Sequence, residues 1–132
     1  MNFKIGENAW NWFTDAKRNA KAPSFEELVK SNNLSDRISF EGRIPHENIN
    51  KFYKNCLALA VPSIWPEPFG IIGIEAMTCK KPVIASDIGG IRDWLDEKKT
   101  GLLFARKSSD ELAKKINLLY NNKSLAKKLG IN

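Results

Sequence analysis

The stretch that decides the fold is residues 57–85, LALAVPSIWPEPFGIIGIEAMTCKKPVIA. Its first five residues, 57–61, form a short apolar run that is typical of a buried strand, and Pro62 stops it. After a Pro- and Gly-containing loop, residues 71–79 are expected to form a helix, and 82–85 are a second short apolar run. A strand, a helix and a strand in this order predict a parallel βαβ unit.

The same alternation continues on both sides of this stretch. Ser24 and Glu27 have the spacing of a capping box, so a helix is expected to begin there. Residues 7–23 show no clear pattern. Strands that alternate with helices place the chain in the α/β class. The sequence predicts further strands at 3–5, 37–41 and 102–104, and further helices at 25–33, 46–55, 90–95, 109–120 and 122–129.

Length and composition favour one ordinary domain over residues 1–132, because 42% of the chain is hydrophobic and a core can form without disulfides. No apolar run approaches the ~20 residues of a membrane-spanning helix, and the N-terminus has no apolar signal segment. Cys56 and Cys79 stand alone in apolar stretches, which indicates reduced thiols and a cytoplasmic location. His46 is the only histidine, so neither a histidine-based metal site nor a Ser-His-Asp triad is expected.

The net charge of +6 is concentrated near the C-terminus, where residues 101–132 hold seven basic and two acidic side chains. The lysines alternate with leucines and isoleucines at helical spacing, which predicts amphipathic helices with a solvated basic face. Contact with an acidic membrane surface, at the inner face of the membrane, is the open alternative. Nucleic-acid binding is not expected, because exposed aromatic residues and Gly-rich basic loops are not interleaved with the lysines.

Three loops follow predicted strands, at 42–45, 62–70 and 86–90. Loops that follow parallel strands emerge at one edge of the sheet, and ligands of open α/β sheets bind in the crevice there. We therefore expect these loops to converge on a binding site.

Glu75 is the first candidate binding residue. The predicted helix around it is apolar almost all round and is expected to be buried, and a buried carboxylate needs hydrogen-bond partners. No Lys or Arg lies one helical turn away. Two interpretations are equally open: a ligand with paired hydroxyls, such as a ribose, or satisfaction by backbone donors or by a residue distant in sequence.

Glu67 is the second candidate. Pro66 and Pro68 stiffen the chain on either side of it, and Pro68 keeps it in an extended conformation. Residues 69–71 then offer free amide N–H groups at a helix N-terminus, where phosphate groups bind readily. A carboxylate, open amides and a second carboxylate suit a sugar, a phosphate and a ribose in sequence. A Pro-rich turn with a capping Glu is the alternative for Glu67 taken singly.

A wider pattern surrounds the two carboxylates, which form E-x₇-E within PS…EPFG…EAM…KPVIASDIGG…TGLL. This pattern resembles the C-terminal, donor-binding domain of the group 1 (family four) retaining glycosyltransferases of the GT-B fold. The resemblance is clearest over residues 37–132. It implies a Rossmann-like, three-layer αβα domain with a parallel sheet, which is one truncated half of a GT-B glycosyltransferase.

The resemblance also implies roles. Glu75 is expected to bind the ribose hydroxyls of a nucleotide-sugar donor, and Glu67, the expected catalytic residue, to contact the transferred sugar. Such enzymes transfer the sugar with retention and usually without a divalent metal, so neither a metal nor another cofactor is expected. The other expected donor-site groups are the N–H groups of Phe69, Gly70 and Ile71 at the sugar and diphosphate, Arg43 and Ile44 at the base with Ser63 nearby, and Gly89 and Gly90 on the far side of the cleft.

The chain departs from this family in what it lacks. The family's donor domain opens with a strand, a Gly-Arg loop and a Lys that together meet the diphosphate, and no such segment precedes Phe3. Arg43 follows a glycine but belongs to a later strand. The acceptor-binding N-terminal domain and the long C-terminal helix are also missing. The chain is therefore expected to be inactive alone, and its acceptor, whether a glycan, a lipid or a small molecule, is open.

Two other functions stay open. A non-catalytic or degenerate GT-B-like fragment could serve as a binding or interaction module. Another GT-B enzyme, such as a nucleotide-sugar epimerase, is expected to carry different catalytic residues. A test for binding of a nucleotide sugar distinguishes the hypothesis of a donor domain from that of a non-catalytic fragment.

Overall fold

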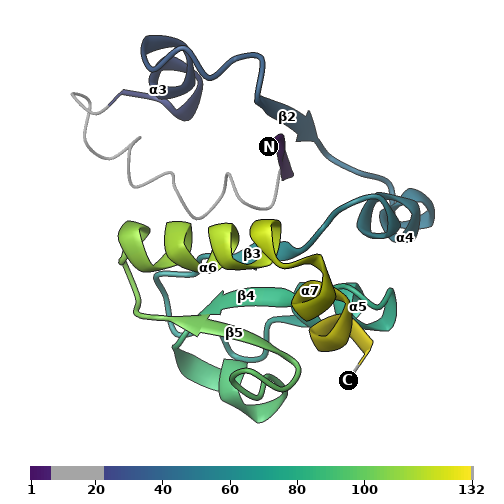
Figure 1. Cartoon of the computed structure of the whole chain (residues 1–132). Helices are drawn as coiled ribbons and strands as arrows, with labels where there is room; N and C mark the ends of the chain where they lie inside the picture. The colour runs from purple at the N-terminus through teal and green to yellow at the C-terminus, as the bar shows by residue number, and fades with distance from the viewer. Residues whose placement is uncertain (7–22, 132) are drawn as a thin grey trace. The chain divides into compact units, whose positions relative to one another are not determined.

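The computed structural model describes residues 1–6 and 23–131, which fall into two compact units, Met1–His46 and Glu47–Asn132 (Figure 1). Each unit has its own parallel sheet. The segment that showed no clear pattern in the sequence, 7–23, lies outside the described residues except for Pro23.

The described part of the first unit holds two parallel strands and one helix. Helix α3 begins with the predicted capping box: the Glu27 amide donates to Oγ of Ser24 at 3.2 Å, and the Ser24 amide donates to the Glu27 carboxylate at 2.6 Å. These bonds satisfy amide groups that a helix start leaves open, so the predicted start of α3 is confirmed. The three elements are β1 (Phe3–Gly6), α3 (Phe25–Ser31) and β2 (Ile38–Gly42).

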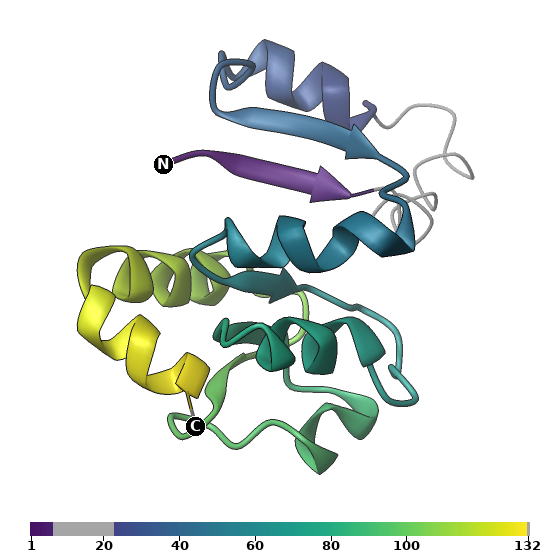
Figure 2. The ribbon, with the colours of Figure 1, turned by 90° about the vertical axis from the view of Figure 1, so that its right-hand side faces the viewer.

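The second unit contains a three-stranded sheet in the order β3-β4-β5, with all neighbouring strands parallel. A helical segment connects each strand to the next along the chain, as the βαβ pattern of the sequence predicts (Figure 2). The elements are α4 (His46–Lys54), which starts at the boundary of the units, β3 (Leu59–Val61), α5 (Ile71–Thr78), β4 (Val83–Ser86), the 3₁₀-helix η1 (Gly89–Asp93), β5 (Gly101–Phe104), α6 (Ser109–Asn121) and α7 (Lys123–Ile131).

Both faces of this sheet are covered. Val83 and Ala85 of β4 pack into one apolar cluster with residues of α4, α5 and η1. Ile84, which points to the opposite face, packs with Leu119 of α6 and Leu129 of α7. The second unit is therefore a three-layer αβα arrangement with a parallel sheet, which confirms the predicted α/β, Rossmann-like fold class.

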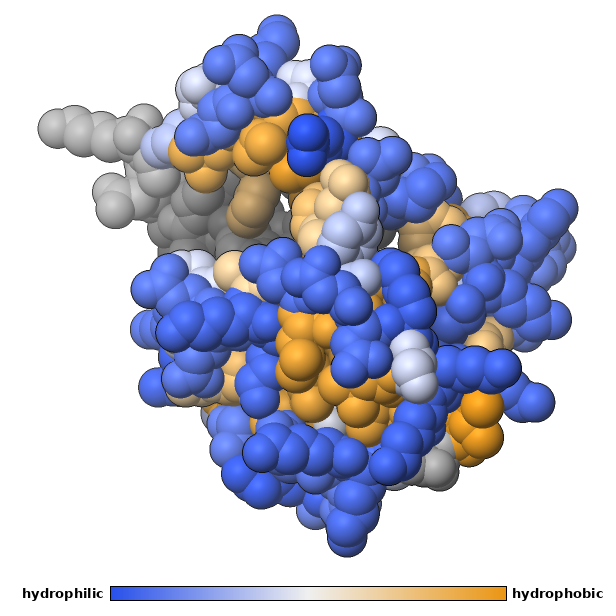
Figure 3. Space-filling model, viewed as in Figure 1, coloured by the Kyte–Doolittle hydropathy of each residue, from blue (hydrophilic) through white to orange (hydrophobic). Residues whose placement is uncertain are grey.

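The last two helices have the amphipathic character that their sequence predicts. Leu119 and Leu129 are buried, whereas Lys114, Lys123 and Lys127 are exposed. Hydrophilic residues cover most of the face that α6 and α7 present in Figure 3, with apolar residues visible between them. The lysines thus form a solvated face.

Three details differ from the sequence-based expectation. The strand expected at 57–61 begins only at Leu59, and Leu57 is exposed. The helix expected at 90–95 is the 3₁₀-helix Gly89–Asp93, a form with i to i+3 hydrogen bonds that stays short. The parallel strands lie in two sheets rather than in one, because β1 and β2 pair with each other in the first unit.

Candidate functional site

The loops after β3 and β4 meet at the carboxyl edge of the second unit's sheet. The Gly90 amide donates to the Glu67 carbonyl at 2.8 Å, and the indole N–H of Trp94 donates to the Phe69 carbonyl. The predicted convergence of loops 62–70 and 86–90 is therefore confirmed. The third loop, 42–45, follows β2 in the first unit, where Arg43 is exposed and Ile44 is half-buried.

Gly89 and Gly90 allow this close approach. A Cβ on Gly89 would lie 2.7 Å from the Glu67 nitrogen, and Gly89 also has a φ of +57°, which side chains rarely adopt. A Cβ on Gly90 would lie 3.1 Å from the carbonyl carbon of Pro68. The two glycines thus have a packing reason that the sequence reading missed, namely contact with the backbone that carries Glu67.

Glu67 is half-buried between its two prolines. Oγ of Ser63 donates to Oε2 of Glu67 at 3.1 Å. No other hydrogen bond to this carboxylate is formed by the residues that the structure describes. Ser63, expected beside a base pocket, therefore contacts Glu67, and one carboxylate oxygen is left without a partner in the described part of the chain.

Glu75 lies in α5 and is half-buried. The hydroxyl of Tyr53, from α4, donates to Oε2 of Glu75 at 3.1 Å. The sequence left two interpretations of Glu75 open, a ligand or a partner within the chain. A residue distant in sequence thus provides the partner for one of its two oxygens. Burial, followed by the hydrogen bond and charge of Glu75, raises the pKa of Tyr53 well above its ordinary value. Tyr53 consequently remains a neutral donor at physiological pH.

The N-terminus of α5 presents unpaired amides. Gly70 occupies the N-cap position in a left-handed conformation, with φ of +76°, and no side chain accepts a hydrogen bond from the first amides of the helix. Within residues 1–6 and 23–131, the amide N–H groups of Phe69, Gly70 and Ile71 make no hydrogen bond. The helix is less buried than its apolar sequence predicts, since the Ile71 side chain is 63% exposed. Gly73 and Ala76 are buried as predicted, but the prediction that the helix is buried is wrong at Ile71, because an all-round apolar pattern does not identify which face is covered.

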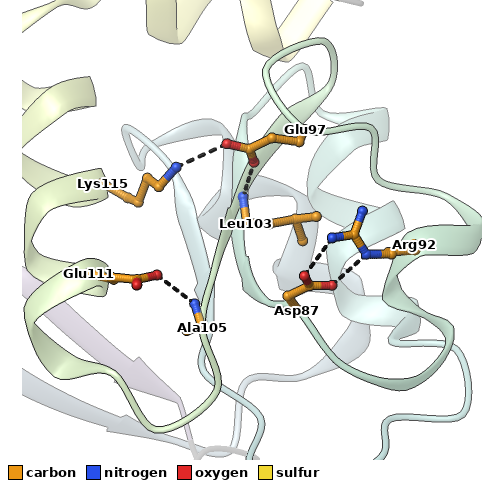
Figure 4. A network of polar contacts seen from close by, with 7 residues as sticks. All are labelled: Asp87, Arg92, Glu97, Leu103, Ala105, Glu111 and Lys115. Carbon is orange, nitrogen blue, oxygen red and sulfur yellow. Dashed lines mark hydrogen bonds and ion pairs between the residues drawn. The ribbon is translucent and has the colours of Figure 1, made fainter.

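Asp87 and Arg92 close the loop after β4 (Figure 4). The Arg92 guanidinium donates to both oxygens of Asp87, at 2.6 and 2.5 Å. The Asp87 amide also donates to the Phe104 carbonyl at 2.8 Å, which ties the loop to β5. These bonds hold the segment that leads into η1.

Two further carboxylates fix α6 and β5 to each other (Figure 4). Glu97 accepts from the Leu103 amide and from Nζ of Lys115, the latter at 2.9 Å. Glu111 accepts from the Ala105 amide at 2.7 Å. Both are structural contacts beside the sheet, and they give the two acidic groups partners within the chain.

The comparisons with known proteins agree with this geometry. The family described as "Glycosyl transferases group 1" matches residues 18–132. The chain belongs to the group 1 glycosyltransferases. It is 39% identical over 107 residues to the uncharacterized glycosyltransferase MJ1178 of Methanocaldococcus jannaschii, a match that covers 81% of this chain and 30% of MJ1178.

Solved structures give the same family picture. Sucrose-phosphate synthase from Thermosynechococcus elongatus superposes with a TM-score of 0.78 at 38% identity, over 88% of this chain and 28% of that one. Anabaena Alr3699/HepE, solved in complex with UDP-glucose, superposes with a TM-score of 0.81 at 27% identity, over 98% of this chain and 34% of that one. This group 1 chain thus spans about a third or less of the length of these relatives, and its fold corresponds to a fragment of GT-B glycosyltransferases.

No helix in residues 1–6 and 23–131 is long and apolar enough to cross a membrane. The same residues hold no group of three or more His, Cys, Asp or Glu side chains that could bind a metal ion.

Sequence reasoning missed two residues that contact the predicted site, Tyr53 and Trp94. Tyr53 belongs to a predicted helix, but nothing in its spacing pointed to Glu75, which lies 22 positions away. Trp94 follows the Gly-Gly pair, and the sequence predicts only that it belongs to a helix at 90–95. Only the folded structure joins them to the site.

Proposed function

We propose that this chain is the donor-binding, C-terminal domain of a retaining glycosyltransferase of the GT-B fold and that it binds a nucleoside diphosphate sugar. The observation that carries the proposal is the order of groups along residues 67–75. Two half-buried carboxylates, Glu67 and Glu75, lie along the chain on either side of three amides that have no partner among the described residues. The complex of the related HepE structure with UDP-glucose supports a ligand of this class.

Glu75 is proposed to bind the ribose. Tyr53 holds Oε2, so Oε1 is the oxygen that can accept a hydrogen bond from a ribose hydroxyl. A carboxylate that accepts from a neutral hydroxyl makes a charge-assisted bond, which is stronger than a neutral one. A ligand diol would complete the partners of this half-buried group.

The α5 N-terminus is proposed to bind the diphosphate and the sugar. The amides of Phe69, Gly70 and Ile71 are donors, and the helix dipole favours negative charge at this end. Such preorganised donors stabilise the charge that develops on a leaving diphosphate. Glu67, oriented by Ser63, is proposed to accept from a hydroxyl of the transferred sugar and to act as the catalytic residue.

The remaining roles concern the complete enzyme. We propose that Arg43 and Ile44 line the base pocket and that Gly89 and Gly90 border the far side of the cleft. The transfer itself needs an acceptor-binding N-terminal domain and basic groups for the diphosphate, so this chain is inactive by itself. The proposed reaction uses no metal or other cofactor. We place the enzyme in the cytoplasm, with peripheral contact at the inner face of the membrane through its basic helices.

Calorimetry and NMR titration of the chain with UDP-, GDP- and ADP-glucose test the proposal. We expect saturable binding of at least one of them, weakened in Glu75→Gln by about tenfold or more, because a hydrogen bond to a charged group is lost. Glu26→Gln, at an exposed position of the first unit, is the matched control and should bind like the parent chain. Absence of binding to all three nucleotide sugars would overturn the proposal and favour a non-catalytic fragment.

A further inference from the structure

Trp94 occupies a notch formed by two glycines. A Cβ on Gly73 would lie 2.9 Å from both Cζ2 and Cζ3 of Trp94, and one on Gly70 would lie 3.3 Å from Cζ2. Glycine is unfavourable inside a helix, yet Gly73 is the third residue of α5 and is buried. The absence of side chains at both positions therefore makes room for the indole ring beneath the first turn of α5.

The indole also makes a polar contact with the loop. Its N–H donates to the carbonyl oxygen of Phe69, which begins the peptide group between Phe69 and Gly70. A trans peptide is planar, and its C=O and N–H point in opposite directions. With the Phe69 carbonyl held toward Trp94, the Gly70 N–H points away from Trp94.

Gly70 does not fix this orientation by itself. Glycine adopts positive φ about as readily as negative φ, so an unrestrained peptide at this position can rotate. The neighbouring residue Pro68 restricts only the chain before it. Among the hydrogen bonds of the described residues, the bond from Trp94 is the one that fixes the Phe69 carbonyl.

We propose that Trp94 is a positioning residue, which sets the peptide plane between Phe69 and Gly70 and thereby directs the Gly70 N–H toward the diphosphate of the donor. This inference rests on the proposed function, since the ligand is the same nucleoside diphosphate. Trp94 itself touches the loop and not the ligand. Its effect should be confined to the phosphate groups and leave recognition of the ribose by Glu75 unchanged.

The decisive variant replaces Trp94 with 3-benzothienylalanine, which keeps the shape of the ring and has no N–H donor. The probes are the nucleoside diphosphate that the parent chain binds best and the corresponding nucleoside. We expect affinity for the diphosphate to fall about tenfold, because hydrogen bonds to a charged group weaken, while affinity for the nucleoside stays the same. The ¹H–¹⁵N signal of Gly70 should shift on addition of the diphosphate in the parent chain and shift less in the variant.

Trp94→Phe serves as the genetically encoded counterpart, and Trp65→Phe, at a 47% exposed position of loop 62–70, is the matched control. Unchanged diphosphate affinity in the benzothienyl variant overturns the inference while the proposed function stands. An equal loss for diphosphate and nucleoside also overturns it, because that pattern indicates a general structural role. A parent chain that binds no nucleoside diphosphate overturns the proposed function itself.

Discussion

The hydroxyl of Tyr53 donates a hydrogen bond of 3.1 Å to the carboxylate of Glu75, and this bond links α4 to α5 in the interior of the second unit. Tyr53 is only 4% exposed, so its hydroxyl has lost most of its access to water. A buried hydroxyl needs a partner, and here the partner is the carboxylate with the clearest proposed role in ligand binding. If Glu75 binds the ligand as proposed, this pair couples stability to recognition.

Tyr53→Phe is expected to lower the free energy of unfolding by about 1 kcal/mol, because the bond is lost and Glu75 keeps its desolvation cost. It should also reduce the preference for a nucleoside diphosphate over its 2′-deoxy analogue, since Glu75 is less well oriented. Urea denaturation and paired titrations measure the two effects. Tyr120→Phe, at the other tyrosine of the chain, changes an exposed side chain and should alter neither quantity. Unchanged discrimination in Tyr53→Phe would contradict the positioning of Glu75 by Tyr53.

Glu67→Gln should separate recognition of the sugar from recognition of the nucleotide. Because Glu67 is proposed to contact the transferred sugar, we expect affinity for the nucleotide sugar to fall about tenfold while affinity for the nucleoside diphosphate stays within about twofold. Isothermal titration with both ligands provides the measurement. An equal loss of affinity for both ligands would show instead that Glu67 acts by holding the structure of the loop.

Gly73→Ala tests the packing of Trp94 against α5. Alanine is favoured over glycine inside a helix by about 1 kcal/mol, but overpacking a filled site typically costs about 1–3 kcal/mol. Since the added methyl meets a rigid ring, we expect a net loss of about 1 kcal/mol in urea denaturation.

The double variant Gly73→Ala with Trp94→Phe is the control for this argument. Phenylalanine lacks the ring atoms that the methyl would meet. In that background Gly73→Ala should become neutral or stabilising. The same loss of stability in both backgrounds would contradict the packing of Trp94 against Gly73.

Alkaline pH should weaken the contribution of Tyr53 to stability. Its pKa is raised in the folded chain, so the unfolded chain releases this proton first, near the ordinary tyrosine pKa of about 10. Above that pH the unfolded state binds fewer protons than the folded state, and stability falls as pH rises. The stability difference between the parent chain and Tyr53→Phe should therefore narrow from about pH 10 upward. A stability difference between the two chains that stays constant between about pH 9 and 11 would contradict the raised pKa of Tyr53.

Metal removal should leave donor binding unchanged. The proposed site holds the diphosphate by amides and a helix N-terminus, which need no bridging cation. We expect the affinity for the nucleoside diphosphate in excess EDTA to lie within about twofold of the value with Mg²⁺. A loss of binding in EDTA, restored by Mg²⁺, would show that a metal takes part.

Much of the second unit could be predicted from the sequence, because its signals are local. Pro62 ends one apolar run and Pro82 begins the next. In the first unit, Ser24 with Glu27 likewise marks the start of a helix by spacing alone. The convergence of loops 62–70 and 86–90 follows from the direction of parallel strands. None of these inferences requires knowledge of which helix packs on which.

The contacts that complete the candidate site could not be predicted, because they depend on tertiary packing. Tyr53 reaches Glu75 only when α4 and α5 pack on the same face of the sheet. Trp94 lies against Gly73 only because η1 turns back toward α5. The exposure of Ile71 depends equally on which side of the helix is covered.

The bond from the Gly90 amide to the Glu67 carbonyl has a consequence for motion. The loop that carries Glu67 is held by a bond from Gly90 and by another from Trp94, both in the segment after β4. It therefore cannot open as an independent flap, and the two loops should open together as one cooperative unit. Hydrogen exchange at the Gly90 amide reports that opening, and the Glu67 loop cannot rearrange faster than the opening itself occurs.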